Sequence, residues 1–314
     1  MNKKTLNLLG QLLLLIATLI WGTSFFILKE TITAVPTFYV LLLRFIPSGI
    51  ILLLVFSKKT FKMGKGTFKR GIILGLILSG AYVTQTLGLT LTTPARNAFV
   101  TSSYVVMIPF LVWALKKAPP KSYNVITAIT CLIGIGFVSF SNGFGSAQNT
   151  AIFGDLLTFV AAIFYAFQIY FITEFQDEND DPISLLSIEL LTVGAICLII
   201  SLVFELPLTI TNGTLNSFHL SGDQLIKIGY LTLACTLLAQ AFQMFGQRYT
   251  TTNQASIILS LESVFGAFFS VLFAGEVLNV IMIIGFIIVF TSVIVNELEI
   301  DFIKLLNGKK GVKK

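Results

Sequence analysis

The chain has 314 residues, of which 55% are hydrophobic and only 11% are charged, and its mean hydropathy is +0.89. Because soluble domains carry about 25% charged residues, this composition excludes an ordinary soluble protein and predicts an integral membrane protein. The net charge of +6 lies in short loops and tails, where Lys and Arg orient membrane helices, so it does not indicate nucleic-acid binding.

Near-continuous apolar runs, rather than alternating ones, favour helices over strands. A membrane span needs about 20 mostly apolar residues. The sequence predicts an all-α fold with ten spans, at roughly 8–29, 36–56, 71–91, 96–115, 122–140, 153–173, 183–205, 225–247, 254–274 and 278–297. No small-residue cleavage site follows the first apolar run, so we expect it to be a retained helix rather than a signal peptide.

The distribution of Lys and Arg predicts the orientation in the membrane. With the N-terminus placed inside, seventeen of these residues fall in cytoplasmic segments, and three, Lys29, Arg96 and Lys227, fall at the outer ends. Cytoplasmic loops carry the excess of positive charge, so we expect both termini to be cytoplasmic. The loop EFQDENDDP is acidic and would also be cytoplasmic, but acidic residues contribute little to this rule.

Two constant offsets indicate an internal duplication. An offset of 144 aligns the first predicted helix with the sixth, pairing Ala17 with Ala161, Trp21 with Tyr165, Phe26 with Tyr170 and Glu30 with Glu174. An offset of 158 pairs Gln85 with Gln243, Gly88 with Gly246, and Thr92-Thr93 with Thr250-Thr251. The alternative is chance similarity among apolar helices. We expect two five-helix repeats, 1–145 and 146–314, the second with a basic cytoplasmic tail. Since five is odd, the repeats would be inverted around a central cavity.

Several segments resemble the EamA-type transporters of the drug/metabolite transporter superfamily. These are WGTSFF in the first helix, Arg44 in LLRF, TTPARNAFVTSSYVVMIPF, and NQASIILSLESVFGAFFSVLFAGEVL. The resemblance implies a ten-helix carrier in the bacterial inner membrane, often an exporter of amino acids or other small metabolites. Two places depart from the family pattern: Glu262-Ser263 stands where Glu-Pro is common, and Lys116-Lys117 where a glycine–glutamate is common.

Three charged residues fall inside predicted spans, where ionisable groups are costly and therefore functional candidates. Glu262 lies about eight residues into its helix, roughly 12 Å deep, and is a candidate for proton coupling or for a structural hydrogen bond. Arg44 and Glu189 lie at similar depths in helices expected to be outer supports. Each is a candidate for an ion pair, and Arg44 is also a candidate for holding an anionic substrate group.

Uncharged polar and aromatic residues complete the predicted cavity. The candidates that hydrogen-bond or stack on a substrate are Trp21, Tyr82, Gln85, Thr101, Tyr104, Tyr165, Gln240 and Gln243. The symmetry between the repeats favours a cavity lining, whereas buried amides that hold helices together are the alternative.

The sequence contains no metal cluster, nucleophile elbow or ATP-binding motif, so no cofactor or catalytic residue is predicted. The favoured function is a secondary transporter, and not an enzyme, that exports a small metabolite such as an amino acid or amphipathic compound by alternating access. It could be proton-coupled or facilitative. An integral membrane enzyme acting on a lipid-linked substrate is the alternative. The expected partners are a small-molecule substrate, the lipid bilayer and protons, without nucleic acid. We expect a monomer, because one chain holds both repeats.

Overall fold

A computed structural model describes residues 3–117, 119–141, 146–176, 181–205, 210–211, 214–215 and 220–297. The first half contains α1 (Lys3–Ile32), α2 (Thr37–Val55), α3 (Ser57–Thr60), α4 (Lys65–Leu91), α5 (Pro94–Thr101), α6 (Tyr104–Lys116) and α7 (Ser122–Ser139). The second contains α8 (Ser146–Phe175), α9 (Pro182–Ile200), η1 (Ser201–Glu205), α11 (Gly222–Tyr230), η2 (Leu231–Leu238), α12 (Ala239–Tyr249), α13 (Thr252–Ser260), α14 (Glu262–Ala274) and α15 (Val280–Glu297). Between η1 and α11, two short strands, β1 (Ile210–Thr211) and β2 (Thr214–Leu215), pair antiparallel.

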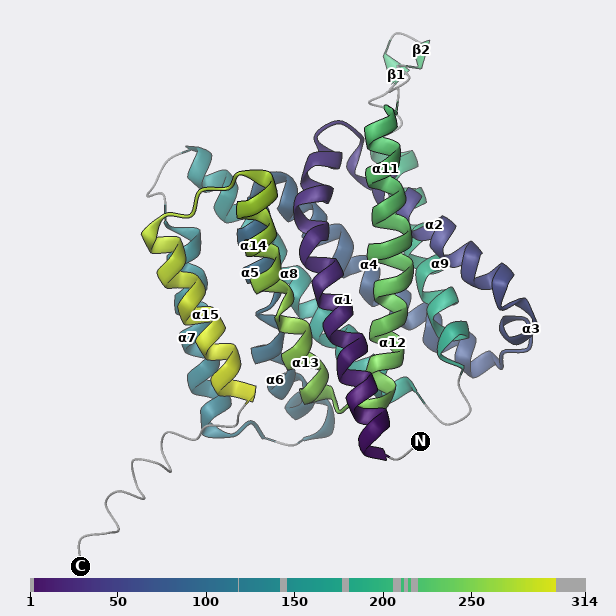
Figure 1. Cartoon of the computed structure of the whole chain (residues 1–314), viewed down its shortest axis with the longest axis horizontal. Coiled ribbons are helices and arrows are strands. Elements are labelled where there is room, and N and C mark those ends of the chain that lie inside the picture. Colours follow the sequence, from purple (N-terminus) through teal and green to yellow (C-terminus); the bar gives the residue numbers. More distant parts are fainter. Residues whose placement is uncertain are drawn as a thin grey trace, which may run out of the picture.

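Nine helical stretches in the described part of the chain are long and apolar enough to cross a membrane, and α15 adds a shorter apolar helix. The protein is therefore an all-α, multi-pass membrane protein, as the sequence predicts, because only helices and closed barrels satisfy every backbone polar group in lipid. α1 begins and α15 ends on the same side of the bundle (Figure 1). Most predicted spans agree with the helices within a few residues, but α4 begins six residues early, at Lys65, and α8 begins at Ser146.

Paired threonines form the same hinge in both halves. α4 ends and α5 begins around Thr92 and Thr93, and α12 ends and α13 begins around Thr250 and Thr251, all with extended backbones. The second threonine of each pair caps the following helix, because its side chain accepts a hydrogen bond from the backbone N–H three residues on. The equivalent threonines thus perform the same structural task.

Each of two predicted spans is interrupted near its middle only by a tighter turn, in which i→i+3 hydrogen bonds replace the α-helical ones while the backbone stays right-handed helical. The span 96–115 breaks at Ser102 and Ser103, whose hydroxyls donate to the carbonyls of Phe99 and Val100. The span 254–274 breaks at Leu261 in the same manner, beside Ser260 and Ser263, whose hydroxyls bond nearby carbonyls. Serine hydroxyls satisfy part of the backbone that the break releases, so these breaks are tolerated at membrane depth.

Glycine pairs bring helices into close contact at opposite ends of the bundle. A Cβ atom on Gly154 of α8 would lie 2.8 Å from the carbonyl oxygen of Gly88 on α4. A Cβ atom on Gly10 of α1 would lie 2.8 Å from the carbonyl oxygen of Gly246 on α12. Only glycine allows backbones this close, which explains both positions as contacts between membrane helices.

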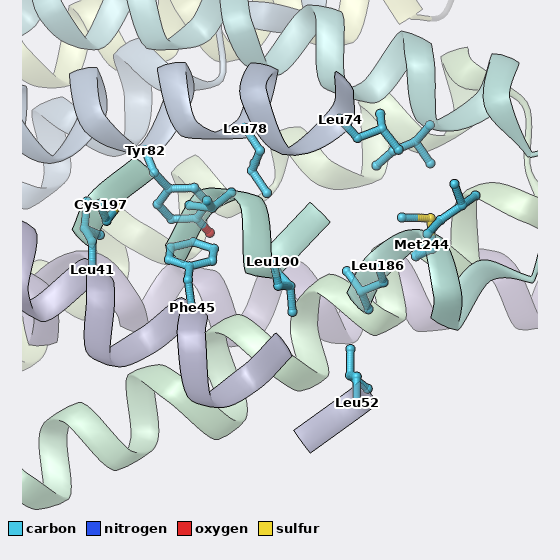
Figure 2. Packing of buried hydrophobic residues seen from close by; sticks show 13 residues of the cluster. Leu41, Phe45, Leu52, Leu74, Leu78, Tyr82, Leu186, Leu190, Cys197 and Met244 are labelled. Atoms are coloured by element: carbon cyan, nitrogen blue, oxygen red, sulfur yellow. The ribbon is translucent and has the colours of Figure 1, made fainter. Parts of the chain in front are cut away.

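One of four clusters of buried apolar side chains lies mainly between α2, α4 and α9, while α7 and α15 pack on each other at one edge (Figure 1). In this cluster, the rings of Phe45 and Tyr82 meet edge to face with centroids 4.7 Å apart (Figure 2). Leu41 and Leu190 pack around them. This places Tyr82 firmly at the wall of the central cavity described below.

Candidate functional site

A cavity lies between helices from both halves of the chain. Its polar and aromatic lining includes nine of the eleven candidates from the sequence: Trp21, Arg44, Tyr82, Gln85, Tyr104, Tyr165, Gln240, Gln243 and Glu262. The remaining lining comes from α1, α4, α5, α8 and α13, namely Ser24, Phe25, Leu28, Leu89, Asn97, Ile169 and Leu259. Neither α7 nor α15 contributes a residue, whereas α2, expected to be an outer support, contributes Arg44.

Arg44 reaches the cavity from α2 and is only 1% exposed. Its Nε donates to the Thr236 hydroxyl at 3.1 Å, and its guanidinium lies 5.3 Å from the Tyr82 ring centroid. Its Nη1 has no hydrogen-bond partner, and no carboxylate pairs with it among the described residues. A buried cation without a counter-ion is costly in a membrane, so this group is suited to meet an anion that enters the cavity.

Glu262 is the acidic residue of the cavity. It begins α14, directly after the break at Leu261, and is 7% exposed. Within the described part of the chain its carboxyl makes no hydrogen bond or ion pair. The simple interhelical hydrogen bond considered from the sequence is therefore absent there, and the carboxyl stays available to a proton or a cationic group.

Tyrosine and amide side chains link α4 to α5, α8 and α12. Gln85 donates from Nε2 to the Thr101 hydroxyl at 3.0 Å, and its Oε1 accepts from the Tyr165 hydroxyl at 2.8 Å. Gln240 donates to the Tyr82 hydroxyl at 3.3 Å. Thr101 itself stands behind Gln85 and does not line the cavity. These contacts fix the orientation of the two amides at the cavity wall.

Glu189 lies outside the lining but is joined to it by one residue. Gln243 donates from Nε2 to Oε1 of Gln168 at 3.0 Å, and Gln168 donates from Nε2 to Oε1 of Glu189 at 3.1 Å. The Glu189 side chain is fully buried, and its Oε2 has no partner. Arg44 and Glu189 therefore do not form an ion pair in this structure. Gln168, which links Glu189 to the lining, was not a candidate from the sequence, although the offset of 144 aligns it with Ser24, a lining residue.

Trp21 is held by the π-helical segment η2. Its Nε1 donates to the carbonyl of Cys235 at 2.8 Å. Segments of π-helix often occur at functional sites. Both Trp21 and Arg44 bind η2 through polar contacts, so this segment sets the position of an aromatic wall and of the buried cation.

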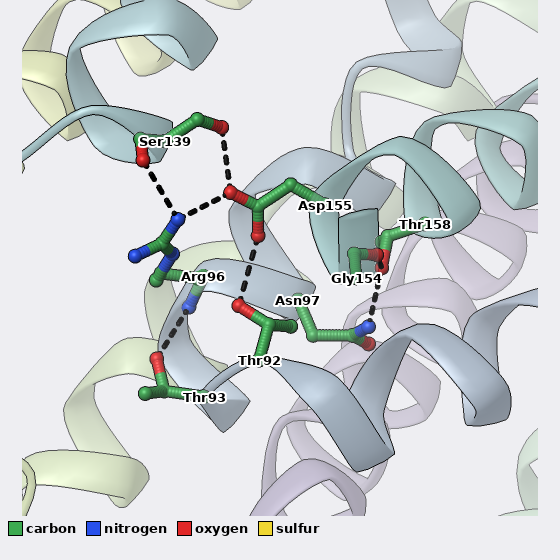
Figure 3. A network of polar contacts seen from close by, with 8 residues as sticks. All are labelled: Thr92, Thr93, Arg96, Asn97, Ser139, Gly154, Asp155 and Thr158. Carbon is green, nitrogen blue, oxygen red and sulfur yellow. Dashed lines mark hydrogen bonds and ion pairs between the residues drawn. The ribbon is translucent and has the colours of Figure 1, made fainter. Parts of the chain in front are cut away.

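Arg96 and Asp155 form a buried charge pair whose residues do not line the cavity, and Figure 3 shows the polar network around the pair. Arg96 donates to Asp155 at 2.5 Å, and the hydroxyls of Thr92 and Ser139 donate to the same carboxylate. From the sequence, Arg96 was expected only as a positive charge at the outer end of the span 96–115. In the structure, Arg96 and its partners join α4, α5, α7 and α8 beside the threonine hinge.

The chain matches the model of the EamA-like transporter family twice, over residues 8–140 and 152–297. The chain belongs to the EamA-like transporter family. This EamA-like protein is therefore a membrane transporter. The two matches fall on the two halves between which the cavity lies.

The EamA-like chain is 27% identical to an uncharacterized transporter of Archaeoglobus fulgidus over 294 residues, which is 94% of this chain and 87% of that protein. A solved crystal structure superimposes with a TM-score of 0.65 at 16% identity, covering 92% of this chain and 96% of that one. This second likeness shows the fold alone. Within the described residues of the EamA-like chain, no group of three or more His, Cys, Asp or Glu side chains is placed to hold a metal ion.

Proposed function

We propose that this EamA-like protein is a secondary transporter that exports a small carboxylate-bearing metabolite, such as an amino acid, by alternating access. The observation that carries the proposal is the buried, unpaired guanidinium of Arg44 in the central cavity. It acts as the site for a substrate carboxylate. Arginine is well suited to this task, because its planar fork matches the geometry of a carboxylate.

The second element of recognition is Glu262, whose carboxyl faces the same cavity without a partner in the described part of the chain. It offers a site for a substrate ammonium group or for a proton. Between the two charges stand Trp21, Tyr82, Tyr104 and Tyr165, which would hold an apolar or aromatic side chain. The combination favours a zwitterionic or amphipathic compound over a purely apolar one.

The packing of the helices supports an arrangement of ten spans as two inverted five-helix repeats. α1 packs on α12 and α14, and α8 packs on the equivalent partners α4, α5 and α6. α2 packs on its own counterpart α9, and α7 on its counterpart α15. A twofold relation between two repeats pairs equivalent helices in this way. In transporters built like this, the substrate site lies at the interface between the repeats.

The two glycine contacts supply a basis for alternating access. One joins α4 and α8 at one end of the bundle, and the other joins α1 and α12 at the opposite end. Opening one contact while the other holds would expose the cavity to one side at a time. We further propose a bacterial inner-membrane location with both termini cytoplasmic, which reporter fusions after residues 145 (outside) and 178 (inside) would test.

A thermal-unfolding screen on the detergent-purified full chain tests substrate recognition. Each amino acid is compared with its methyl ester, which lacks the carboxylate, and with its N-acetyl form, which lacks the ammonium group. We expect only the free amino acids to raise the melting temperature of the wild type, and the Arg44→Gln variant to lose this response. An ester that raises it equally would exclude a carboxylate site at Arg44.

Transport itself is tested in proteoliposomes loaded with the best compound of that screen. Counterflow of labelled compound, absent from empty liposomes and lost in Arg44→Gln, is the result expected of a carrier. Chemical conversion of the compound without movement would instead indicate the membrane enzyme that the sequence left as the alternative.

A further inference from the structure

Asn97 of α5 borders the central cavity, although it was not a candidate from the sequence. Its side chain is fully buried and reaches between α4 and α8 (Figure 3). Its Nδ2 donates to the backbone carbonyl of Gln85 at 3.2 Å and to the hydroxyl of Thr158 at 2.7 Å. Both hydrogens of the amide nitrogen are therefore used within the protein.

The oxygen of the same amide has no such contact. The Thr158 hydroxyl donates its hydrogen to the carbonyl of Gly154 at 2.8 Å, so it can only accept from Asn97. The carbonyl of Gln85 is also an acceptor, and two acceptors hold the amide nitrogen on their side. Oδ1 is left buried without a hydrogen bond in the described part of the chain. An unpaired buried acceptor is costly, so binding of a donor at Oδ1 is favourable.

The other repeat shows that the fold does not need this amide. The offset of 158 pairs Asn97 with Ala255 of α13, and both donate their backbone N–H to the second threonine of the hinge, each at 2.9 Å. The offset of 144 pairs Thr158 with Leu14, and Leu14 and Ala255 belong to one apolar cluster. The hinge and the following helix thus form with alanine at this position, which favours a role for Asn97 in the cavity.

Asn97 selects a ligand differently from the two charged residues of the lining. Arg44 presents an unpaired cationic donor and Glu262 presents a carboxyl, so both respond to the charge of a ligand. Oδ1 of Asn97 is an uncharged acceptor, so it accepts from an ammonium group and from a hydroxyl group. It distinguishes a ligand that carries an N–H or O–H donor from one that has only carbon and hydrogen there.

We propose that Asn97 is a specificity-determining residue, whose Oδ1 accepts a hydrogen bond from an ammonium or hydroxyl group of the substrate while Arg44 holds the carboxylate. The inference rests on the proposed function, because it requires a carboxylate-bearing substrate. It narrows the substrate class to amino acids and hydroxy acids. A carboxylic acid with the same carbon skeleton and no such donor leaves Oδ1 unpaired, and sites that hydrogen-bond a substrate group discriminate against analogues that lack it.

The test compares three ligands with one carbon skeleton. Each free amino acid that raises the melting temperature of the wild type is compared with its hydroxy acid and with its deaminated acid; for leucine these are leucic acid and isocaproic acid. Dissociation constants are measured by isothermal titration calorimetry on the detergent-purified full chain. We expect the wild type to bind the hydroxy acid roughly tenfold more tightly than the deaminated acid. Asn97→Leu should bind the two acids with equal affinity.

Thr86→Val is the matched control. It also removes a buried polar atom without a partner among the described residues, but Thr86 does not line the cavity. This variant should keep the tenfold preference for the hydroxy acid. A merely structural effect of Asn97→Leu would weaken both acids alike and leave the ratio of the two dissociation constants as in the wild type, which would overturn the proposal.

Glu262→Gln separates Asn97 from the cavity carboxyl and decides the outcome if Asn97→Leu does not fold. The preference for the hydroxy acid should persist in Glu262→Gln, whereas its loss would assign the hydroxyl to Glu262 and overturn the proposal. Equal affinity for the hydroxy acid and the deaminated acid in the wild type would overturn it as well. If no amino acid stabilises the wild type, the proposed function itself fails, so the two failures are distinguishable.

Discussion

Nη2 of Arg96 lies 2.5 Å from a carboxylate oxygen of Asp155, and neither side chain is more than 3% exposed. The pair joins α5 to α8, with Thr92 and Ser139 donating to the same carboxylate. Burying two charges is costly, but once they are buried, removing one leaves the other without compensation.

We expect Asp155→Leu to lower the free energy of unfolding by about 3–5 kcal/mol, because Arg96 would stay buried without its counter-ion. The melting temperature of the detergent-purified chain measures this. Asp181→Asn is the control, because its partner Lys59 is 64% exposed and Asp181 itself 30%, and asparagine keeps the cap of α9. Equal shifts of the melting temperature in the two variants would show that the buried Arg96–Asp155 pair contributes no more to stability than the Lys59–Asp181 pair.

The glycine contact between α4 and α8 gives a second prediction. Gly154→Ala places a methyl group against the carbonyl of Gly88, and we expect it to cost about 1–3 kcal/mol of stability through forced separation of the helices. Gly136→Ala on α7 meets nothing within 4 Å and should leave the melting temperature unchanged or slightly raised. The contact between α4 and α8 is not tight if both variants behave alike.

The ends of α6 and α14 give a third prediction. Both helices end at a residue with a left-handed backbone, Lys117 with φ of 60° and Gly275 with φ of 64°. A side chain is strained there and glycine is not, so Lys117→Gly should stabilise the protein by about 1 kcal/mol. Gly275→Lys should destabilise it by a similar amount. A lower melting temperature for Lys117→Gly would mean that contacts of the lysine outweigh the backbone strain.

Hydropathy and the repeat offsets predicted the helices well, because a membrane span must be long and apolar and must form all its backbone hydrogen bonds within the helix. They did not reveal the breaks at Ser102–Ser103 and Leu261. No glycine stands at either point, and Pro109, which lies inside α6, is several residues beyond the first break. Side-chain hydroxyls bonded to nearby carbonyls make these breaks possible, and a serine in an apolar run does not distinguish a break from a continuous helix.

The lining of the cavity was largely predictable, because costly polar groups in equivalent places of two repeats face the same interface. The partners of the charged residues were not. Arg44 was a candidate both for an ion pair and for holding an anionic substrate group, and Arg96 was expected only as a charge at the outer end of a span. Pairing depends on how helices distant in sequence rotate against each other, and one sequence does not contain that information.

The last prediction concerns coupling to protons. Glu262 faces the cavity, and within the described residues it has no hydrogen-bond partner, so a proton and a substrate cation would compete for the same carboxyl. Glu262→Gln preserves size and hydrogen bonding but removes titration. We expect it to abolish uphill transport driven by a pH gradient in proteoliposomes, while the protein stays folded and still exchanges substrate. Glu189→Gln, outside the lining, is the matched control and should retain uphill transport. Uphill movement by Glu262→Gln with the pH dependence of the wild type would make Glu262 structural. If the wild type itself moves no substrate uphill, the carrier is a facilitator and the cavity carboxyl serves recognition alone.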